Sequence, residues 1–204
     1  MKIKRILLIA LLMLSNFLLF ADSPLTSTQF SLAYKSEKIV TTASLTEGKL
    51  TEEIMDYLVG ENEIDIKMAV INELGWKFEG KSNKTIFLDY LMKKKNYKNI
   101  DDFSKKASGD ELLCMAYIMA LDDYFKVDEA IKMADKALSK NNKSYTFQII
   151  TALIKAQKAF DSSWCDVYRL TNNVRTNTKL IKDMNDEASQ IIFDYMDLYK
   201  NDCK

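Results

Sequence analysis

The stretch SGDELLCMAYIMAL, residues 108–121, decides the fold of this chain. Ser108 and Glu111 make the S-x-x-E pattern of a capping box, in which each side chain accepts a hydrogen bond from a backbone N–H at the start of a helix. The ten residues from Leu112 to Leu121 are all apolar. On a helical wheel they cover every direction, which is typical of a helix enclosed by neighbours. The run is too short to cross a bilayer, which needs about 20 apolar residues.

Signals of the same kind predict helices on both sides of this stretch, separated by short polar breaks. Capping residues, apolar side chains at helical spacing and glycine stops set their limits. The predicted helices cover Thr51–Val59, Asp65–Gly75, a segment that begins at Asn83, Asp101–Ala107, Asp128–Ser139, Ser144–Phe160 and a segment capped by Ser162 or Ser163. Helix breakers are scarce, with 5 Gly and 1 Pro in 204 residues. We therefore expect an all-α fold, built as an antiparallel stack of helical hairpins.

The stack is expected to form a single α-helical domain over residues 51–204. Its parts are short helices at 51–107, hairpin repeats at 108–177 and a long amphipathic helix at 178–200. The apolar residues of this last helix fall in one arc and its acidic residues face away, as a capping helix with a polar outer side requires. Residues 22–50 are interpreted as an irregular N-terminal arm with a short helix around Phe30–Tyr34.

From Tyr124 the sequence reads YFKVDEAIKMADKALSKN, in which Ala130, Ala134 and Ala137 are spaced four and three residues apart. Small residues at this spacing let two helices approach closely. The string resembles the second helix of a tetratricopeptide repeat, and the resemblance covers roughly residues 111–142. It implies a superhelix of helical hairpins in the C-terminal half and a protein-binding scaffold, with no catalytic residues.

The beginning of the chain has the composition of a secretory signal peptide. Lys2, Lys4 and Arg5 precede an apolar run from Ile6 to Phe20, and the small residue Ala21 follows. We expect cleavage at the end of this leader, residues 1–21. The mature protein is then secreted or periplasmic, and it keeps no stable membrane span.

Three cysteines are present, Cys114, Cys165 and Cys203. Cys114 lies inside the central apolar run and is interpreted as a small buried hydrophobic residue. Cys165 and Cys203 are the only plausible pair for a disulfide, which an exported protein can keep.

The composition removes several classes of function. Histidine is absent, and with it the commonest general base and the commonest metal ligand. The chain has 29 basic and 29 acidic side chains, and the leader holds basic residues only, so the mature protein is slightly acidic. This balance gives no electrostatic reason to expect nucleic acid as a partner. No phosphate loop, nucleophile elbow or metal-ligand spacing occurs, so we expect no catalytic residue, cofactor or metal.

Two charged groups have both a functional and a structural interpretation, and the structural one is favoured for each. The acidic group consists of the pairs Asp101–Asp102 and Asp122–Asp123. A glycosidase needs two carboxylates, but acidic residues also stabilise a helix N-terminus. The basic group consists of Lys93, Lys94, Lys95 and Lys98, with Tyr97 between them. It has the character of a nucleic-acid patch, but positive charge also stabilises the last turn of a helix.

Aromatic residues and glycosylation patterns supply the remaining candidates. Trp76, Phe78 and Trp164 could line a ligand groove, but aromatic residues at helical spacing are more often core, so we expect them to be buried. Asn83-Lys84-Thr85 and Asn142-Lys143-Ser144 fit the N-glycosylation pattern. Both asparagines also lie at predicted helix boundaries, where Asn is a favoured cap.

These observations favour a non-catalytic, exported scaffold that binds a protein or peptide partner on a helical surface. A narrower hypothesis is an inhibitor or immunity protein for an exported toxin or hydrolase. A carboxylate-dependent cell-wall glycan hydrolase and a purely structural envelope component are the alternatives from other classes. Two facing carboxylates about 5–9 Å apart in a cleft would favour the hydrolase.

Overall fold

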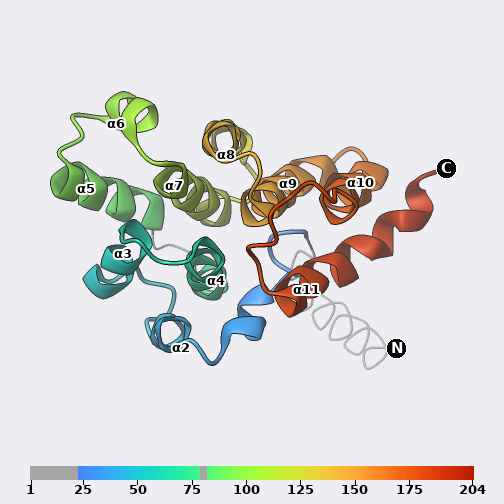
Figure 1. Cartoon of the computed structure of the whole chain (residues 1–204), viewed down its shortest axis with the longest axis horizontal. Coiled ribbons are helices and arrows are strands. Elements are labelled where there is room, and N and C mark those ends of the chain that lie inside the picture. The colour runs from blue at the N-terminus through green and yellow to red at the C-terminus, as the bar shows by residue number, and fades with distance from the viewer. Residues whose placement is uncertain (1–22, 79–81) are drawn as a thin grey trace, which may run out of the picture.

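The computed structural model describes residues 23–78 and 82–204, and the regular structure in these ranges is helical throughout (Figure 1). The α-helices are α2 (Lys38–Ser44), α3 (Glu52–Val59), α4 (Ile64–Gly75), α5 (Asn83–Lys95), α6 (Ile100–Lys106), α7 (Gly109–Asp122), α8 (Asp128–Lys140), α9 (Tyr145–Phe160), α10 (Trp164–Arg175) and α11 (Asp186–Met196). Two 3₁₀-helices are η2 (Phe30–Tyr34) and η3 (Asp197–Asp202). The predicted all-α helical stack is confirmed.

The predicted signal peptide, residues 1–21, lies outside the described residues. Within residues 23–78 and 82–204, no helix is long and apolar enough to cross a bilayer.

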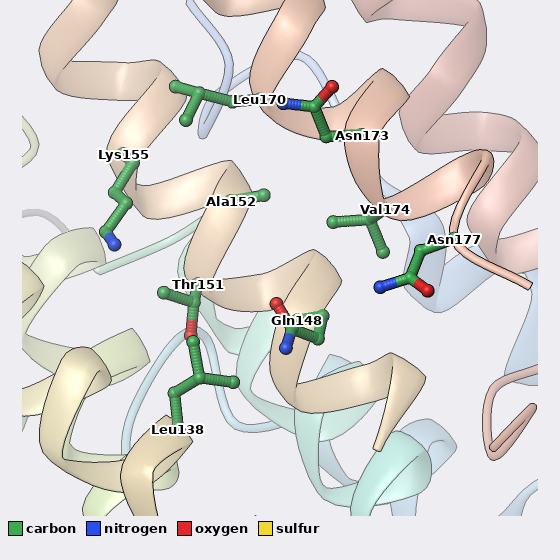
Figure 2. A pocket seen from close by; sticks show the side chains of 9 residues that line it. All are labelled: Leu138, Gln148, Thr151, Ala152, Lys155, Leu170, Asn173, Val174 and Asn177. Carbon is green, nitrogen blue, oxygen red and sulfur yellow. The ribbon is translucent and has the colours of Figure 1, made fainter. Parts of the chain in front are cut away.

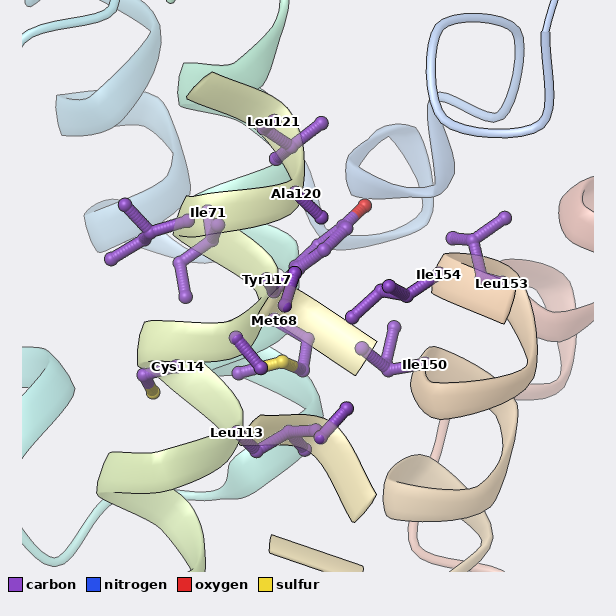
Figure 3. Packing of buried hydrophobic residues seen from close by; sticks show 14 of the residues in the cluster. Met68, Ile71, Leu113, Cys114, Tyr117, Ala120, Leu121, Ile150, Leu153 and Ile154 are labelled. Carbon is purple, nitrogen blue, oxygen red and sulfur yellow. The ribbon is translucent and has the colours of Figure 1, made fainter. Parts of the chain in front are cut away.

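Helix α7 lies at the centre of the stack, with α3, α4, α5, α8 and α9 packed around it (Figure 1). The predicted capping box is present. Ser108 Oγ accepts a hydrogen bond from the N–H of Glu111 at 3.2 Å, and Glu111 Oε2 accepts one from the N–H of Ser108 at 2.8 Å. Every residue from Leu112 to Ile118 is buried, and side chains of α4 and α9 meet α7 from different sides (Figure 3). The helix is therefore enclosed, as its apolar run predicts.

Two helical hairpins follow each other in the C-terminal half, α7 with α8 and α9 with α10. Ala130, Ala134 and Ala137 are buried on α8, which packs against both α7 and α9. A close approach also joins α4 to α7, because a Cβ added at Gly75 would lie 2.7 Å from Leu121 Cδ1. Gly75, predicted as a helix stop, is the last residue of α4 and lets these two central helices touch.

Residues 22–50 were expected to form an irregular arm, but the described part of this segment enters the core. The short helix expected at Phe30–Tyr34 is present as η2, and α2 follows it without having been predicted. Leu25 is buried, and the ring of Phe30 stacks on that of Tyr117 with centroids 6.2 Å apart. The burial arises from packing of η2 on α4 and α11 and of α2 on α4, partners that no local sequence pattern reveals.

A buried hydrogen-bond network centred on Asn72 of α4 holds the N-terminal segment in place. Asn72 Oδ1 accepts a hydrogen bond from the N–H of Ser31 at 2.9 Å. Asn72 Nδ2 donates to the carbonyl of Thr28 at 3.0 Å and to Tyr117 Oη at 2.9 Å. Burial raises the pKa of Tyr117, so its hydroxyl stays protonated. One amide side chain therefore joins the N-terminal segment, α4 and α7.

The helix predicted over 178–200 starts later than expected, and this is a correction to the sequence prediction. Helix α11 begins at Asp186, and η3 replaces α-helix after Met196. Asn185 is the N-cap, because its Oδ1 accepts hydrogen bonds from two backbone N–H groups of the first turn. Such a strong cap sets the start of the helix regardless of the apolar pattern before it.

Residues 178–184 pair with the start of α9 instead of forming a helix. The N–H of Ile181 donates to the carbonyl of Lys143 at 2.8 Å, and the N–H of Tyr145 donates to the carbonyl of Ile181 at 3.0 Å. Asp183 of this segment also caps the first turn of α9, because its Oδ1 accepts a hydrogen bond from the N–H of Thr146 at 2.8 Å. Ile181 is consequently 62% exposed, although it belongs to the predicted apolar arc. These long-range bonds prevail over the local helical pattern.

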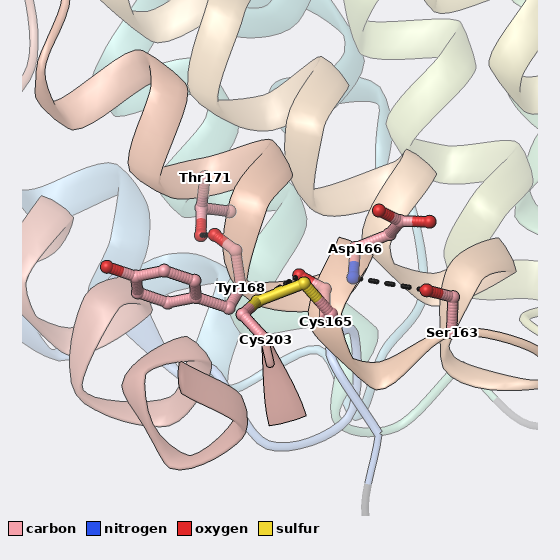
Figure 4. Close-up of a disulfide and its surroundings, with 6 residues drawn as sticks. All are labelled: Ser163, Cys165, Asp166, Tyr168, Thr171 and Cys203. Atoms are coloured by element: carbon pink, nitrogen blue, oxygen red, sulfur yellow. Dashed lines mark hydrogen bonds between the residues drawn. A yellow bond between two sulfur atoms is a disulfide. The ribbon is translucent and has the colours of Figure 1, made fainter. Parts of the chain in front are cut away.

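Cys165 and Cys203 form a disulfide that fastens the end of the chain to α10 (Figure 4). Their Cα atoms lie 4.7 Å apart. The guanidinium of Arg175 on α10 also donates to both carboxylate oxygens of Asp197 in η3, at 2.9 and 2.8 Å, which lowers the pKa of Asp197. Cys114 is buried in α7, and this burial raises the pKa of its thiol.

The double variant Cys165→Ala/Cys203→Ala should lower the free energy of unfolding by up to about 4 kcal/mol, because the unfolded chain then regains the entropy of an open loop. Urea unfolding, followed by circular dichroism with and without reductant, measures this loss. Cys114→Ala is the control and should keep the response to reductant. An unfolding midpoint of the natural protein that reductant leaves unchanged would contradict the prediction.

Asn72→Ala should lower the free energy of unfolding by about 3 kcal/mol, because the substitution leaves three buried polar groups without their partner. Limited proteolysis should then cut first within residues 23–34. Asn173→Ala, on the exposed side of α10, is the matched control and should change stability by less than about 0.5 kcal/mol. Equal unfolding midpoints for the two variants would show that the network does not hold the segment.

Candidate functional site

The structure places the two acidic pairs at separate helix ends. Asp101 and Asp102 lie in the first turn of α6, whereas Asp122 ends α7 and Asp123 follows it. The carboxylate of Asp122 accepts hydrogen bonds from the first two N–H groups of α5, at 3.2 and 2.7 Å. Burial raises the pKa of Asp122, whereas a hydrogen bond from Lys106 lowers the pKa of Asp102. Both carboxylates are thus engaged in helix capping or ion pairing.

Two of the four lysines around Tyr97 are paired with carboxylates of other helices. Lys94 Nζ lies 2.7 Å from Asp56 Oδ1, and Lys95 Nζ lies 3.5 Å from Glu111 Oε1. The hydroxyl of Tyr97 donates to Glu111 Oε2 at 3.0 Å. Burial, together with this hydrogen bond, raises the pKa of Tyr97 to about 12. Lys93, Lys94 and Lys95 lie in the last turn of α5, as the structural interpretation expects, and two of them also link α5 to other helices.

The expectation that three aromatic candidates are buried holds only for Phe78. Trp76 and Trp164 are 41% and 55% exposed, so the expectation is wrong for both. Trp76 follows the last residue of α4, and Trp164 is the first residue of α10. Helix ends are less covered by neighbours than helix centres, although the ring of Trp164 still lies beside that of Tyr199, with centroids 6.3 Å apart.

The two glycosylation patterns differ in accessibility. Asn83 is fully buried, and its side chain bonds to the backbone of Gly48 and Leu50 at 2.7 and 3.2 Å. Such an amide cannot receive a glycan in the folded protein. Asn142 is exposed in the turn between α8 and α9.

The strongest candidate site is a groove between α8 and α10 that has α9 as its floor, here named the α8–α10 groove (Figure 2). Its volume is about 200 Å³. The lining residues are Leu138 of α8, then Gln148, Thr151, Ala152 and Lys155 of α9, then Leu170, Asn173 and Val174 of α10, and finally Asn177, which follows α10.

The groove exists because α9 presents small side chains between its two neighbours. Thr151 and Ala152 are buried and form the floor. The larger Leu138 and Leu170, which are half-buried, come from the two flanking helices, and both of these helices pack against α9. The lining residues of α9 recur three and four positions apart, so a single face of this helix is presented to the groove.

Three amide side chains surround the groove, those of Gln148, Asn173 and Asn177 (Figure 2). Gln148 Nε2 donates to the carbonyl of Asn142 at 2.9 Å, which leaves its Oε1 as an acceptor. Asn177 Oδ1 accepts a hydrogen bond from the N–H of Lys179 at 3.1 Å, which leaves its Nδ2 as a donor. The rim of the groove therefore offers donors and acceptors side by side.

A buried hydroxyl lies at the floor of the groove. Thr151 Oγ1 has no hydrogen-bond partner among the residues that the structure describes. A buried polar group in this situation costs about 1–3 kcal/mol. Nearby, Lys155 brings a positive charge, which is paired with Asp135 of α8 at 2.6 Å.

Comparison of the chain with protein-family models, with curated proteins and with solved structures found no match. In the part of the chain that the structure describes, no group of three or more cysteine, aspartate or glutamate side chains is arranged to hold a metal ion. The α8–α10 groove is therefore assigned from its geometry alone.

None of the lining residues was predicted from the sequence. In the sequence, the polar lining residues cannot be told apart from the solvent-exposed residues of any helix. Thr151 lies in a regular helical pattern, which does not reveal that its hydroxyl is unpaired. The available signal is the four-residue spacing of Asn173 and Asn177, which would place two amides on the same side of a helix, although Asn177 lies just beyond the end of α10.

Thr151→Val should raise the free energy of unfolding by about 1 kcal/mol, because a methyl group of similar shape replaces an unpaired buried hydroxyl. Thr151→Ser, which keeps the hydroxyl, is the control and should show no gain. Chemical denaturation of the three proteins measures the difference. A loss of stability in Thr151→Val would mean that the hydroxyl already has a partner within the folded chain.

Proposed function

We propose that this protein is an exported, non-catalytic helical scaffold that binds an extended peptide segment of a partner protein in the α8–α10 groove. The observation that carries the proposal is the arrangement of amide side chains around an apolar floor that contains an unpaired, buried hydroxyl. The resemblance of α8 to a tetratricopeptide helix supports the same class of function.

Amide side chains suit a peptide backbone, because each presents the N–H donor and the carbonyl acceptor that a peptide group also carries. Asn173 and Asn177 lie on the α10 side of the groove, and Gln148 lies on its floor helix. Leu138 and Leu170 supply apolar contact for side chains of the bound segment. Main-chain hydrogen bonds would give affinity, and the pocket between the leucines would give specificity.

The size of the groove favours an extended segment over a helical one. A helix with its side chains is about 10–12 Å across, which a groove of about 200 Å³ does not accommodate. An extended chain points successive side chains in opposite directions and can insert one side chain at a time. An acidic side chain in the bound segment would meet Lys155, whose ammonium has donors beyond the one that faces Asp135.

The test places a photo-crosslinking amino acid at position 173, on the groove, in cells that produce the protein. Irradiation should attach one defined protein segment at this position. The matched control carries the same amino acid at position 105, on the exposed side of α6, and should not attach that segment. Ala152→Phe fills the floor of the groove and should reduce crosslinking from position 173 by about tenfold.

A synthetic peptide of the crosslinked segment then provides the binding measurement. Isothermal titration should show saturable binding to the natural protein and binding that is weaker by about tenfold in Ala152→Phe. Circular dichroism checks that this variant is folded. Unchanged affinity in the folded Ala152→Phe protein, or equal crosslinking from positions 173 and 105, would overturn the proposal.

A further inference from the structure

A second cavity, of about 530 Å³, lies at the end of the stack where α7 begins. The ends of α3, α5, α6 and α8 converge on this cavity, and α4 contributes Lys67 to its wall. The first turn of α7 contributes Asp110 and Glu111. The cavity shares no lining residue with the α8–α10 groove.

Lys67 is the most informative residue of this cavity, because it is a lysine that is only 2% exposed. Its Nζ donates to Asp110 Oδ2 at 2.9 Å, and no second acceptor for it occurs among the described residues. An ammonium group has three N–H donors, so two of them remain for the contents of the cavity. Burying an ammonium whose N–H donors lack acceptors is costly. A bound group that accepts hydrogen bonds from these donors would offset that cost.

The rest of the wall shows the same excess of donors. Lys140, at the end of α8, donates to one backbone carbonyl at 2.6 Å, which also leaves it two donors. The buried carboxylate of the wall, by contrast, is occupied. Glu111 Oε2 accepts hydrogen bonds from the N–H of Ser108 and from the hydroxyl of Tyr97, and Glu111 Oε1 pairs with Lys95. Of the two charged groups buried in the wall, Lys67 and Glu111, the ammonium is therefore the one that keeps unused hydrogen-bonding capacity.

The lining residues carry charges of both signs. The basic ones are Lys67, Lys95, Lys106 and Lys140, and the acidic ones are Glu61, Asp110 and Glu111. Lys67, Lys95 and Lys106 each pair with a carboxylate, so Lys140 and Glu61, both exposed, are the lining charges without an ion pair among the described residues. A negatively charged group in the cavity would thus be attracted to Lys140 and to the unused donors of Lys67.

We propose that this cavity binds a small organic molecule through a carboxylate or phosphate group that Lys67 and Lys140 hold. The volume lies within the range of small-molecule sites, which are about 300–1,000 Å³. Hydrogen bonds between an ammonium and an oxyanion are charge-assisted and are stronger than neutral ones. The site is independent of the α8–α10 groove, so either assignment can fail without the other.

The experiment titrates the purified protein with sodium phosphate and, separately, with sodium succinate, at an ionic strength held constant with sodium chloride. Isothermal titration and the thermal unfolding midpoint are the readouts. Lys67→Met removes the buried ammonium and keeps its aliphatic length, and Asp110 is 38% exposed and can then be hydrated. Lys140→Ala removes the second ammonium from the exposed end of α8. Lys105→Ala, an exposed lysine of α6 that does not line the cavity, is the control.

The expected result is saturable binding of at least one of the two anions. Its affinity should fall by about tenfold in Lys67→Met and in Lys140→Ala and stay unchanged in Lys105→Ala. A preference for phosphate or for succinate identifies the anionic group of the natural ligand. Absence of saturable binding to both anions would overturn the proposal. So would an equal loss of affinity in Lys105→Ala and Lys140→Ala, because that result reports only the overall charge of the protein.

Discussion

The structure depends above all on the enclosure of α7. A helix that is apolar in every direction is stable in water only if its whole circumference is covered, so α3, α4, α5, α8 and α9 each turn an apolar face toward it. The polar ends of α7 are satisfied separately. Its first turn closes in the capping box, and Asp122, its last residue, accepts hydrogen bonds from the first N–H groups of α5. The carboxylate of the last residue of α7 therefore caps the first turn of α5, which ties the start of that helix to the end of α7.

The two cavities arise where this covering is incomplete. Around α9, the small side chains of Thr151 and Ala152 leave the space between α8 and α10 unfilled. At the start of α7, the ends of several helices converge around the second cavity. Polar groups without a full set of protein partners lie in both places, Thr151 in one and Lys67 in the other. Both proposed binding sites thus lie at the margins of an otherwise closely packed core.

Helices with explicit caps were predictable, and structure set by distant partners was not. Thr51, Ser108 and Ser163 all occupy the N-cap positions expected of them. Helix α2, which has no side-chain cap, was not predicted. The helix expected at 178–200 begins only at Asp186, because the residues before it pair with the start of α9. The burial of Lys67 could be read from its helical spacing to Ile71 and Leu74. The cavities themselves could not, because their existence depends on the sizes of side chains brought together from several helices.

Two contacts join the N-terminal segment to partners far along the chain. The N–H of Leu25 donates to Gln157 Oε1 at 3.1 Å, and Tyr34 Oη accepts a hydrogen bond from the N–H of Asn185 at 3.1 Å. These pairs are separated by 132 and 151 residues. Because synthesis proceeds from the N-terminus, this segment leaves the ribosome well before Gln157 and Asn185. These two contacts can therefore form only when most of the chain has been made.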